Sequence, residues 1–308
     1  MKRLPIMMII GVCLLASLVA GCGTPSSGSL GPAPTATAQT PSPAGSPGSG
    51  TASAAPSPSG QRPTATPVQG PACEIGLQAW FSRNGKLFVT QRTVPATTGI
   101  GQAALDRMLT GPSAAEYAAG LRSRIPAGTT VRGVRISAGI ATVDLSSSFE
   151  SAASPSAMPL RIAQVVYTLT QFPTVTGVRF AINGQGVTVV GGVPVQSPQT
   201  RAMYGGYLPA ITVRSPVIGA RVTSPVTVSG TADVFEATVS LRILDSAGHE
   251  IARTFTTASC GTGCRGDYSA TIPYSVPRSQ PGTIEVFESS AKDGQPVNVQ
   301  LIPVTLMP

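Results

Sequence analysis

The sequence predicts two folded domains, an α+β domain whose elements follow the order ββαββαββ and an all-β domain built as an antiparallel sandwich. Three observations predict this fold class. Residues 23–72 contain no apolar pattern that could build a core, residues 73–192 alternate strand and helix periodicities, and residues 210–308 show short strand patterns separated by turns. With 308 residues, the chain has room for two domains of ordinary size beside its N-terminal segment.

The N-terminus has the layout of a secretory signal. Lys2 and Arg3 precede an apolar run from Ile6 to Ala20, which is shorter than the roughly 20 residues that a membrane-spanning helix needs. The run ends in Leu18-Val19-Ala20-Gly21-Cys22, which resembles the lipobox of bacterial lipoproteins. The resemblance implies that residues 1–21 are a signal peptide and that Cys22 becomes the first mature residue, carrying diacylglycerol and a further acyl chain such as palmitate.

Lipid on Cys22 would decide where the protein resides. Two or more acyl chains anchor a protein stably, so we expect the mature chain on the outer face of the cell membrane. The alternative is an ordinary secretory signal with an incidental cysteine at position 22.

Residues 22–72 are rich in Pro, Ser and Thr with the single charge Arg62, and they predict a disordered linker. Such a linker would span about 40 Å if flexible and up to about 150 Å if stiffened by proline.

Residues 73–192 predict one sheet covered by two helices. Asn-Gly pairs at 84–85 and 183–184 predict tight hairpins. Helical spacing predicts helices over residues 103–109 and 160–172, which end at Pro112 and Pro173. The expected strands cover residues 75–81, 87–90, 130–136, 140–145, 178–182 and 187–190.

Four motifs of this region are more specific than its periodicity. They are residues 109–112 (LTGP), 125–129 (IPAGT), 140–146 (IATVDLS) and 164–178 (QVVYTLTQFPTVTGV). Together they resemble the GerMN domain, a module named for a sporulation and germination protein. The resemblance covers nearly all of residues 73–192. It implies an extracytoplasmic assembly module akin to ring-building domains, with no established catalytic residues.

A connector at residues 193–209 leads to the second domain at 210–308. Its seven predicted strands lie at residues 211–213, 226–231, 238–244, 250–257, 268–274, 283–288 and 297–304. The motifs Ser215-Pro216, Ser224-Pro225-Val226, Val234-Phe235-Glu236-Ala237 and Val286-Phe287-Glu288-Ser289 resemble the Gmad2 domain, an immunoglobulin-like module associated with spore germination. Gmad2 domains accompany GerMN domains, so each resemblance supports the other. The region lacks the inter-sheet cysteine pair and core Trp of antibody domains.

The formal charge of +8 raises the question of nucleic acid binding. Residues 73–192 hold 10 Lys and Arg against 5 Asp and Glu, whereas residues 210–308 hold 7 against 8, so only the first domain is basic. Its arginines are spread singly, without the clusters and interleaved aromatics that nucleic acids require. We therefore expect no nucleic acid partner.

Three cysteines remain beyond the lipobox. Cys260 and Cys264 flank a Gly-Thr-Gly loop, and export would expose them to an oxidising compartment, so we expect a structural disulfide. A zinc site would need about four ligands, and the chain has one histidine and no second close cysteine pair. Cys73 could be a free thiol, form an intermolecular bond, or pair with Cys260 or Cys264.

Candidate catalytic groups lack a suitable setting. His249, the one histidine, falls in a predicted hairpin turn, and no Gly-x-Ser-x-Gly elbow accompanies it. Residues 289–292 spell the Ser-x-x-Lys of penicillin-binding enzymes, but they follow a strand instead of opening a helix. Residues 265–267 spell the integrin-binding triplet Arg-Gly-Asp, which arises often by chance.

Carboxylates and cofactor motifs give no stronger indication. Asp106, Asp144 and Glu150 could form paired carboxylates, although nothing in the pattern brings them together. No nucleotide-binding or EF-hand motif occurs, so we expect no cofactor, no metal and no enzyme activity.

The sequence favours a cell-envelope lipoprotein that acts as a non-catalytic binding or assembly module. Its process could be sporulation, germination or envelope regulation. The expected partners are the membrane, through the anchor, and envelope proteins or further copies of the chain, with peptidoglycan left open as another. Two alternatives are an envelope enzyme that acts on peptidoglycan and a receptor subunit for a small germinant or solute.

Overall fold

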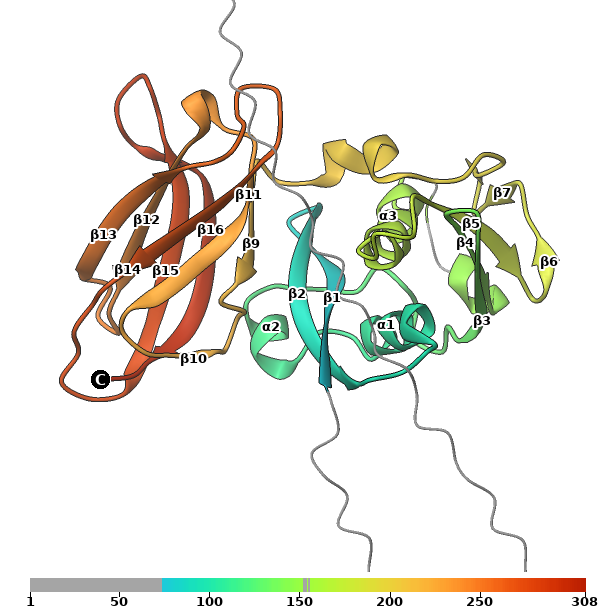
Figure 1. Cartoon of the computed structure of the whole chain (residues 1–308), viewed down its shortest axis with the longest axis horizontal. Helices are drawn as coiled ribbons and strands as arrows, with labels where there is room; N and C mark the ends of the chain where they lie inside the picture. The colour runs from blue at the N-terminus through green and yellow to red at the C-terminus, as the bar shows by residue number, and fades with distance from the viewer. Residues whose placement is uncertain (1–73, 152–153, 155) are drawn as a thin grey trace, which may run out of the picture. The chain divides into compact units, whose positions relative to one another are not determined.

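The computed structural model describes residues 74–151, 154 and 156–308 (Figure 1). The predicted signal peptide, Cys22, the linker and Cys73 lie outside the described residues. Within the described part, no helix has both the length and the apolarity to cross a membrane.

The first domain has the predicted α+β character, but its strands divide between sheets. Its elements are β1 (Glu74–Arg83), β2 (Lys86–Pro95), α1 (Ile100–Leu109), α2 (Ala114–Ala118), β3 (Val131–Ser137), β4 (Ile140–Leu145), η1 (Ser147–Glu150), α3 (Met158–Leu169), β5 (Gly177–Ile182), β6 (Gln185–Gly186), β7 (Val189–Val190), β8 (Val193–Pro194) and η2 (Arg201–Tyr207). β1 and β2 form one two-stranded sheet, a second sheet has the order β3-β4-β5-β6, and β7 pairs with β8 in a small third sheet. The sequence prediction of one sheet is therefore corrected.

Helices α1 and α3 form the middle layer of this domain. Both pack against β1, and on their other side α1 contacts β3 while α3 contacts β5 (Figure 1). Eleven of the twelve residues of α3 are buried, as expected for a helix enclosed between two layers. Its side chains join those of both sheets in the core, which includes Trp80, Phe81, Leu105, Val143, Val166 and Phe180.

The second domain is the predicted sandwich. Its strands are β9 (Ile211–Ser215), β10 (Arg221–Val222), β11 (Val226–Ala232), β12 (Thr238–Leu244), β13 (Glu250–Thr257), β14 (Gly266–Ile272), β15 (Gln280–Ser289) and β16 (Pro296–Leu306), with a short 3-10 turn η3 (Phe235–Ala237) before β12. A five-stranded sheet of order β10-β16-β15-β12-β13 faces a three-stranded sheet of order β14-β11-β9. Alternate residues of facing strands, including Val228, Leu241 and Val286, are fully buried between the sheets.

Candidate interaction site

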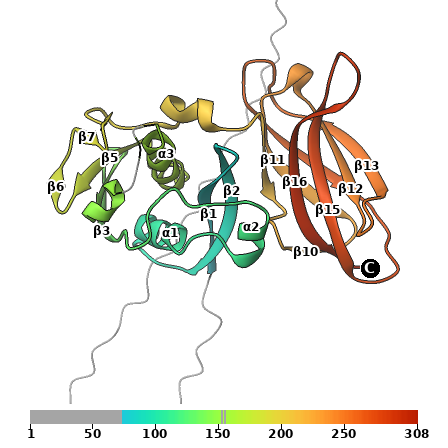
Figure 2. The ribbon, with the colours of Figure 1, turned by 180° about the vertical axis from the view of Figure 1, so that it is seen from behind.

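Three loops meet at one end of the sandwich, as both views of the ribbon show (Figures 1 and 2). We define the loop end as residues 233–237, 259–265 and 288–296. Hydrogen bonds tie the loops together. Phe235 N donates to Glu288 Oε1 at 2.9 Å, Glu236 N to Thr262 Oγ1 at 3.0 Å, and Gly263 N to Asp233 Oδ1 at 2.8 Å. The loop end is therefore one connected structure.

A disulfide between Cys260 and Cys264 closes the middle loop. The loop packs tightly on η3, because a Cβ at Gly261 would lie 2.5 Å from the N and Cα atoms of Ala237. Glycine is needed at position 261 for this approach. The short covalent loop thus holds Thr262 and Gly263 where their neighbours in the first loop can bond to them.

The backbone of the loop end is strained. Glu236, Ala237 and Thr262 have φ angles of +52°, +55° and +54°, a conformation that residues other than glycine rarely adopt. Each such residue costs on the order of 1 kcal/mol or more, and strained residues gather at functional sites. This concentration of strain in one bonded cluster singles out the loop end as the candidate site.

The strained turn presents an aromatic side chain to solvent. Phe235 is 52% exposed, and the carboxylate of Glu236 beside it is exposed as well. Glu288 is fixed by Asn298 Nδ2, which donates to its Oε2 at 2.6 Å. The loop end also carries Asp233 and Asp293. The loop end therefore presents an apolar knob, the exposed phenyl ring of Phe235, surrounded by carboxylates.

The sequence alone did not reveal this site. Residues 234–237 belong to a sequence motif, but periodicity indicates neither the outward position of Phe235 nor the positive φ angles. The available signal is a phenylalanine followed by a glutamate, three residues after the strand ends at Ala232.

The Arg-Gly-Asp triplet at residues 265–267 is occupied by internal contacts. Arg265 donates to the carbonyl oxygens of Pro209 and Ala210, and burial lowers the pKa of its guanidinium. Asp267 forms an ion pair with Arg214 at 2.6 Å. The triplet therefore fastens the connector to the second domain instead of presenting a free recognition sequence.

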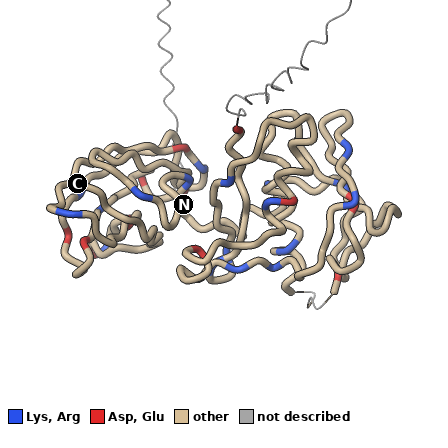
Figure 3. The backbone as a smooth tube through the Cα atoms, turned by 90° about the horizontal axis from the view of Figure 1, so that it is seen from below, with Lys and Arg blue, Asp and Glu red and all other residues tan. Residues whose placement is uncertain are grey.

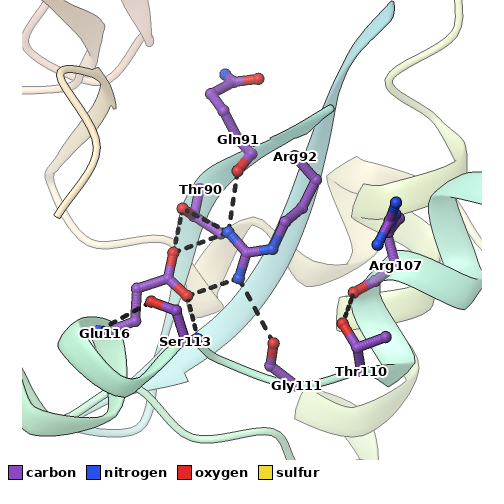
Figure 4. A network of polar contacts seen from close by, with 8 residues as sticks. All are labelled: Thr90, Gln91, Arg92, Arg107, Thr110, Gly111, Ser113 and Glu116. Carbon is purple, nitrogen blue, oxygen red and sulfur yellow. Dashed lines mark hydrogen bonds and ion pairs between the residues drawn. The ribbon is translucent and has the colours of Figure 1, made fainter. Parts of the chain in front are cut away.

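The best-connected polar network of the first domain surrounds Glu116 (Figure 4). Arg92 Nη2 donates to Glu116 Oε2 at 2.6 Å and Nη1 to Oε1 at 2.9 Å, while Thr90 donates to the same carboxylate. Ser113 and Glu116 also form a reciprocal capping box at the start of α2. With its side chain only 3% exposed, Glu116 joins β2 to the segment after the LTGP motif, which is a structural role.

The carboxylates considered as catalytic candidates do not converge. Asp144 pairs with Arg132 at 3.4 Å, Glu150 accepts a hydrogen bond from Gly191 N, and Asp106 lies on the surface of α1, where partial burial raises its pKa. Across residues 74–151, 154 and 156–308, no group of three or more His, Cys, Asp or Glu side chains could hold a metal ion.

The remaining catalytic candidates lie in the settings that the sequence predicted. The side chain of His249 is 80% exposed in the turn between β12 and β13, where Asp245 Oδ2 lies 3.5 Å from its Nδ1. Ser289 ends β15, and Lys292 follows in an exposed loop instead of a helix.

Comparison with known families agrees with this architecture. Residues 80–188 match the family model described as "Sporulation and spore germination", and residues 210–295 match the Gmad2 model, "Immunoglobulin-like domain of bacterial spore germination". The chain thus contains two domains whose families are associated with sporulation and spore germination. More particularly, it has the GerMN plus Gmad2 architecture. Neither of these two domain families is known as a family of enzymes.

Solved structures give weaker likenesses. The first GerMN domain of the sporulation protein GerM from Bacillus subtilis is 27% identical, with 42% of this chain and 98% of that chain covered and a TM-score of 0.37. The tandem GerMN domains of the same protein are 18% identical, with 67% and 63% covered and a TM-score of 0.37. A putative lipoprotein from Clostridium perfringens is 20% identical, with 42% and 89% covered and a TM-score of 0.32. No curated protein matches the chain.

Proposed function

We propose that this chain is an exported envelope lipoprotein that binds a protein partner through the loop end, in a process linked to sporulation or germination. Lipid on Cys22 anchors it to the outer face of the cell membrane, and residues 22–72 act as a stalk that carries the two domains. The chemistry is recognition, without a catalytic step. The families matched by both domains support the link to sporulation and germination.

The exposure of Phe235 on a constrained backbone carries this proposal. Aromatic side chains that enter a pocket of a partner supply much of the energy of protein interfaces. A loop that is already fixed loses little conformational entropy on binding, so more of its contact energy becomes affinity. Hydrogen bonds to Glu288 and Thr262, together with the disulfide, fix the backbone beside Phe235 before any partner arrives.

Photocrosslinking in native cells tests the proposal. The full chain is produced with a photoreactive phenylalanine analogue at position 235 and, as the matched control, at position 255. Phe255 is a stringent control because it is 71% exposed in the same domain and lies on β13, outside the residues that define the loop end but only four residues before them. We expect a discrete covalent adduct from position 235 and none from position 255.

Substitution gives the second arm of the test. Phe235→Ser should abolish crosslinking from a probe at residue 262, the neighbouring loop residue, whereas Phe255→Ser should leave the yield unchanged. Equal adducts from positions 235 and 255, or none from either, would refute recognition through the loop end.

A further inference from the structure

The four-stranded sheet of the first domain has one face that no described element covers. α1 and α3 pack on the face of Val134, Val143 and Phe180, so the alternate residues point the other way. On this uncovered face, Arg135 of β3, Thr142 of β4 and Arg179 of β5 lie directly opposite one another in the strand register, and all three are exposed.

The two arginines of this row carry positive charges that no neighbouring carboxylate in the described residues neutralises. Within the described residues, neither Arg135 nor Arg179 forms an ion pair or a side-chain hydrogen bond, unlike Arg132, which pairs with Asp144 in the next row. Asp144 is further occupied by Gly184 N, which donates to its Oδ1 at 2.9 Å. Elsewhere, charged residues are thinly spread over the chain (Figure 3), so two free arginines in one row form a distinct feature.

A hollow lies beside the arginines. Its volume is about 410 Å³, and its walls include the small residues Gly133, Ala181 and Gly184 as well as Arg135 and the ion-paired Asp144. Glycine within a strand leaves room for another group to approach the backbone. The uncovered face therefore combines two unpaired arginines with space for an apolar side chain.

The loop end has the complementary features. Phe235 projects from it, and the four carboxylates of Asp233, Glu236, Glu288 and Asp293 stand against two cations in the same loops. One of these cations, Arg265, is engaged with backbone carbonyl groups. An acidic surface with a phenyl knob matches a basic surface with a hollow, in charge and in shape.

We infer that the loop end of one copy of this chain docks on the uncovered sheet face of a second copy, with Phe235 in the hollow and Glu236 beside Arg135. The inference rests on the proposed function, because it names the partner of the loop end. The contact joins two different surfaces, so after it forms one copy still has a free hollow and the other a free Phe235, and the same contact can repeat into a chain of copies.

Charge reversal in the full-length chain, purified in detergent, tests the contact. The dissociation constant between two differently labelled copies is measured by fluorescence energy transfer. Arg135→Glu, Arg179→Glu and Glu236→Arg should each weaken association by about tenfold or more, because like charges then face each other. Arg107→Glu is the control, since Arg107 is an exposed arginine on α1 in the same domain. It should leave the dissociation constant unchanged.

The double variant Glu236→Arg with Arg135→Glu provides the decisive arm. It should recover most of the lost affinity, because the pair is restored with its signs exchanged. Circular dichroism verifies that every variant is folded before its affinity is interpreted. Failure of the double variant to recover affinity, or unchanged association in all single variants, would overturn the inference.

Crosslinking from position 235 separates this inference from the proposed function. Adducts with residues 133–144 or 179–184 of a second copy support both. Adducts with a different envelope protein alone overturn self-association and leave recognition through the loop end intact. Absence of any adduct overturns both.

Discussion

The side-chain amide of Gln171 pairs with the main chain of Gln78 in the way that a neighbouring strand would. Gln78 N donates to Gln171 Oε1 at 2.7 Å, and Gln171 Nε2 donates to Gln78 O at 2.8 Å. About two helical turns earlier, Gln164 Nε2 donates to Trp80 O at 2.8 Å. These amides from α3 and the residues after it satisfy the free edge of β1, which explains why the hairpin β1–β2 lies over the helices without joining the larger sheet.

Gln171→Ala should therefore destabilise the first domain. The substitution leaves the N–H and C=O groups of Gln78 without partners, and losing such bonds costs about 1–3 kcal/mol of the free energy of unfolding. Urea titration followed by Trp80 fluorescence reports this value for the first domain alone, because Trp80 is the one tryptophan of the chain. Gln185→Ala, at an exposed hairpin position, is the control and should change stability by less than about 0.5 kcal/mol. Equal stability of the two variants would contradict the structural role of the amide.

The buried carboxylate of Glu116 should make stability depend on pH. Burial by itself would raise the pKa of Glu116, but hydrogen bonds from Arg92, Thr90 and Ser113 N outweigh burial and hold this pKa below its usual value. A pKa lowered in the folded state adds stability at pH values above the unfolded pKa of about 4.3, and this stability is lost as the pH falls through the folded pKa.

Comparison of Glu116→Gln with the wild type isolates this effect. The free energy of unfolding at pH 7 should fall by about 1.5–3 kcal/mol, because hydrogen bonds to a charged group are lost. Between pH 5 and pH 3 the difference between the two proteins should shrink, since protonation removes the charge from the wild type as well. A difference that grows on acidification would show that Glu116 does not have a lowered pKa.

Removal of the disulfide should loosen the loop end and leave the sandwich intact. The double variant Cys260→Ser with Cys264→Ser opens a loop of five residues, which corresponds to about 2 kcal/mol of lost stabilisation in the chain-entropy model. Hydrogen exchange should accelerate at Thr262 N and Gly263 N, whose partners lie in the neighbouring loop, and stay slow at Val239 and Leu241 in the core. Unchanged exchange at residues 262 and 263 would mean that the hydrogen bonds alone fix the loop.

Periodicity predicted the second domain better than the first. The predicted strands at 238–244 and 250–257 coincide with β12 and β13, because both are short runs rich in β-branched and apolar residues on either side of the turn Asp245-Ser-Ala-Gly248. In the first domain, the five residues of α2 are too few for a helical period, although Ser113-x-x-Glu116 is a capping-box signal that could have indicated it. The division into two sheets depends on glutamine amides replacing a strand, which no periodic pattern encodes.

The candidate site is even harder to predict from the sequence than the fold of the first domain. The cysteine spacing predicts a closed loop at 260–264, whereas residues 234–237 carry only the resemblance to Gmad2. The loop end, however, is assembled from three segments that are separated by whole strands, and its contacts run from Asp233 to Gly263 and from Phe235 to Glu288. Only the folded arrangement brings them together.

The proposed recognition takes place in the envelope, so it requires that the chain stand outside the membrane on a lipid anchor. Mass spectrometry of the N-terminal peptide of the protein from its native membrane tests this directly. We predict a chain that begins at Cys22 and carries two or more acyl chains, and a Cys22→Ser variant that is absent from the membrane in that lipidated form. An intact chain that retains residues 1–21 in the cytosol would contradict the account.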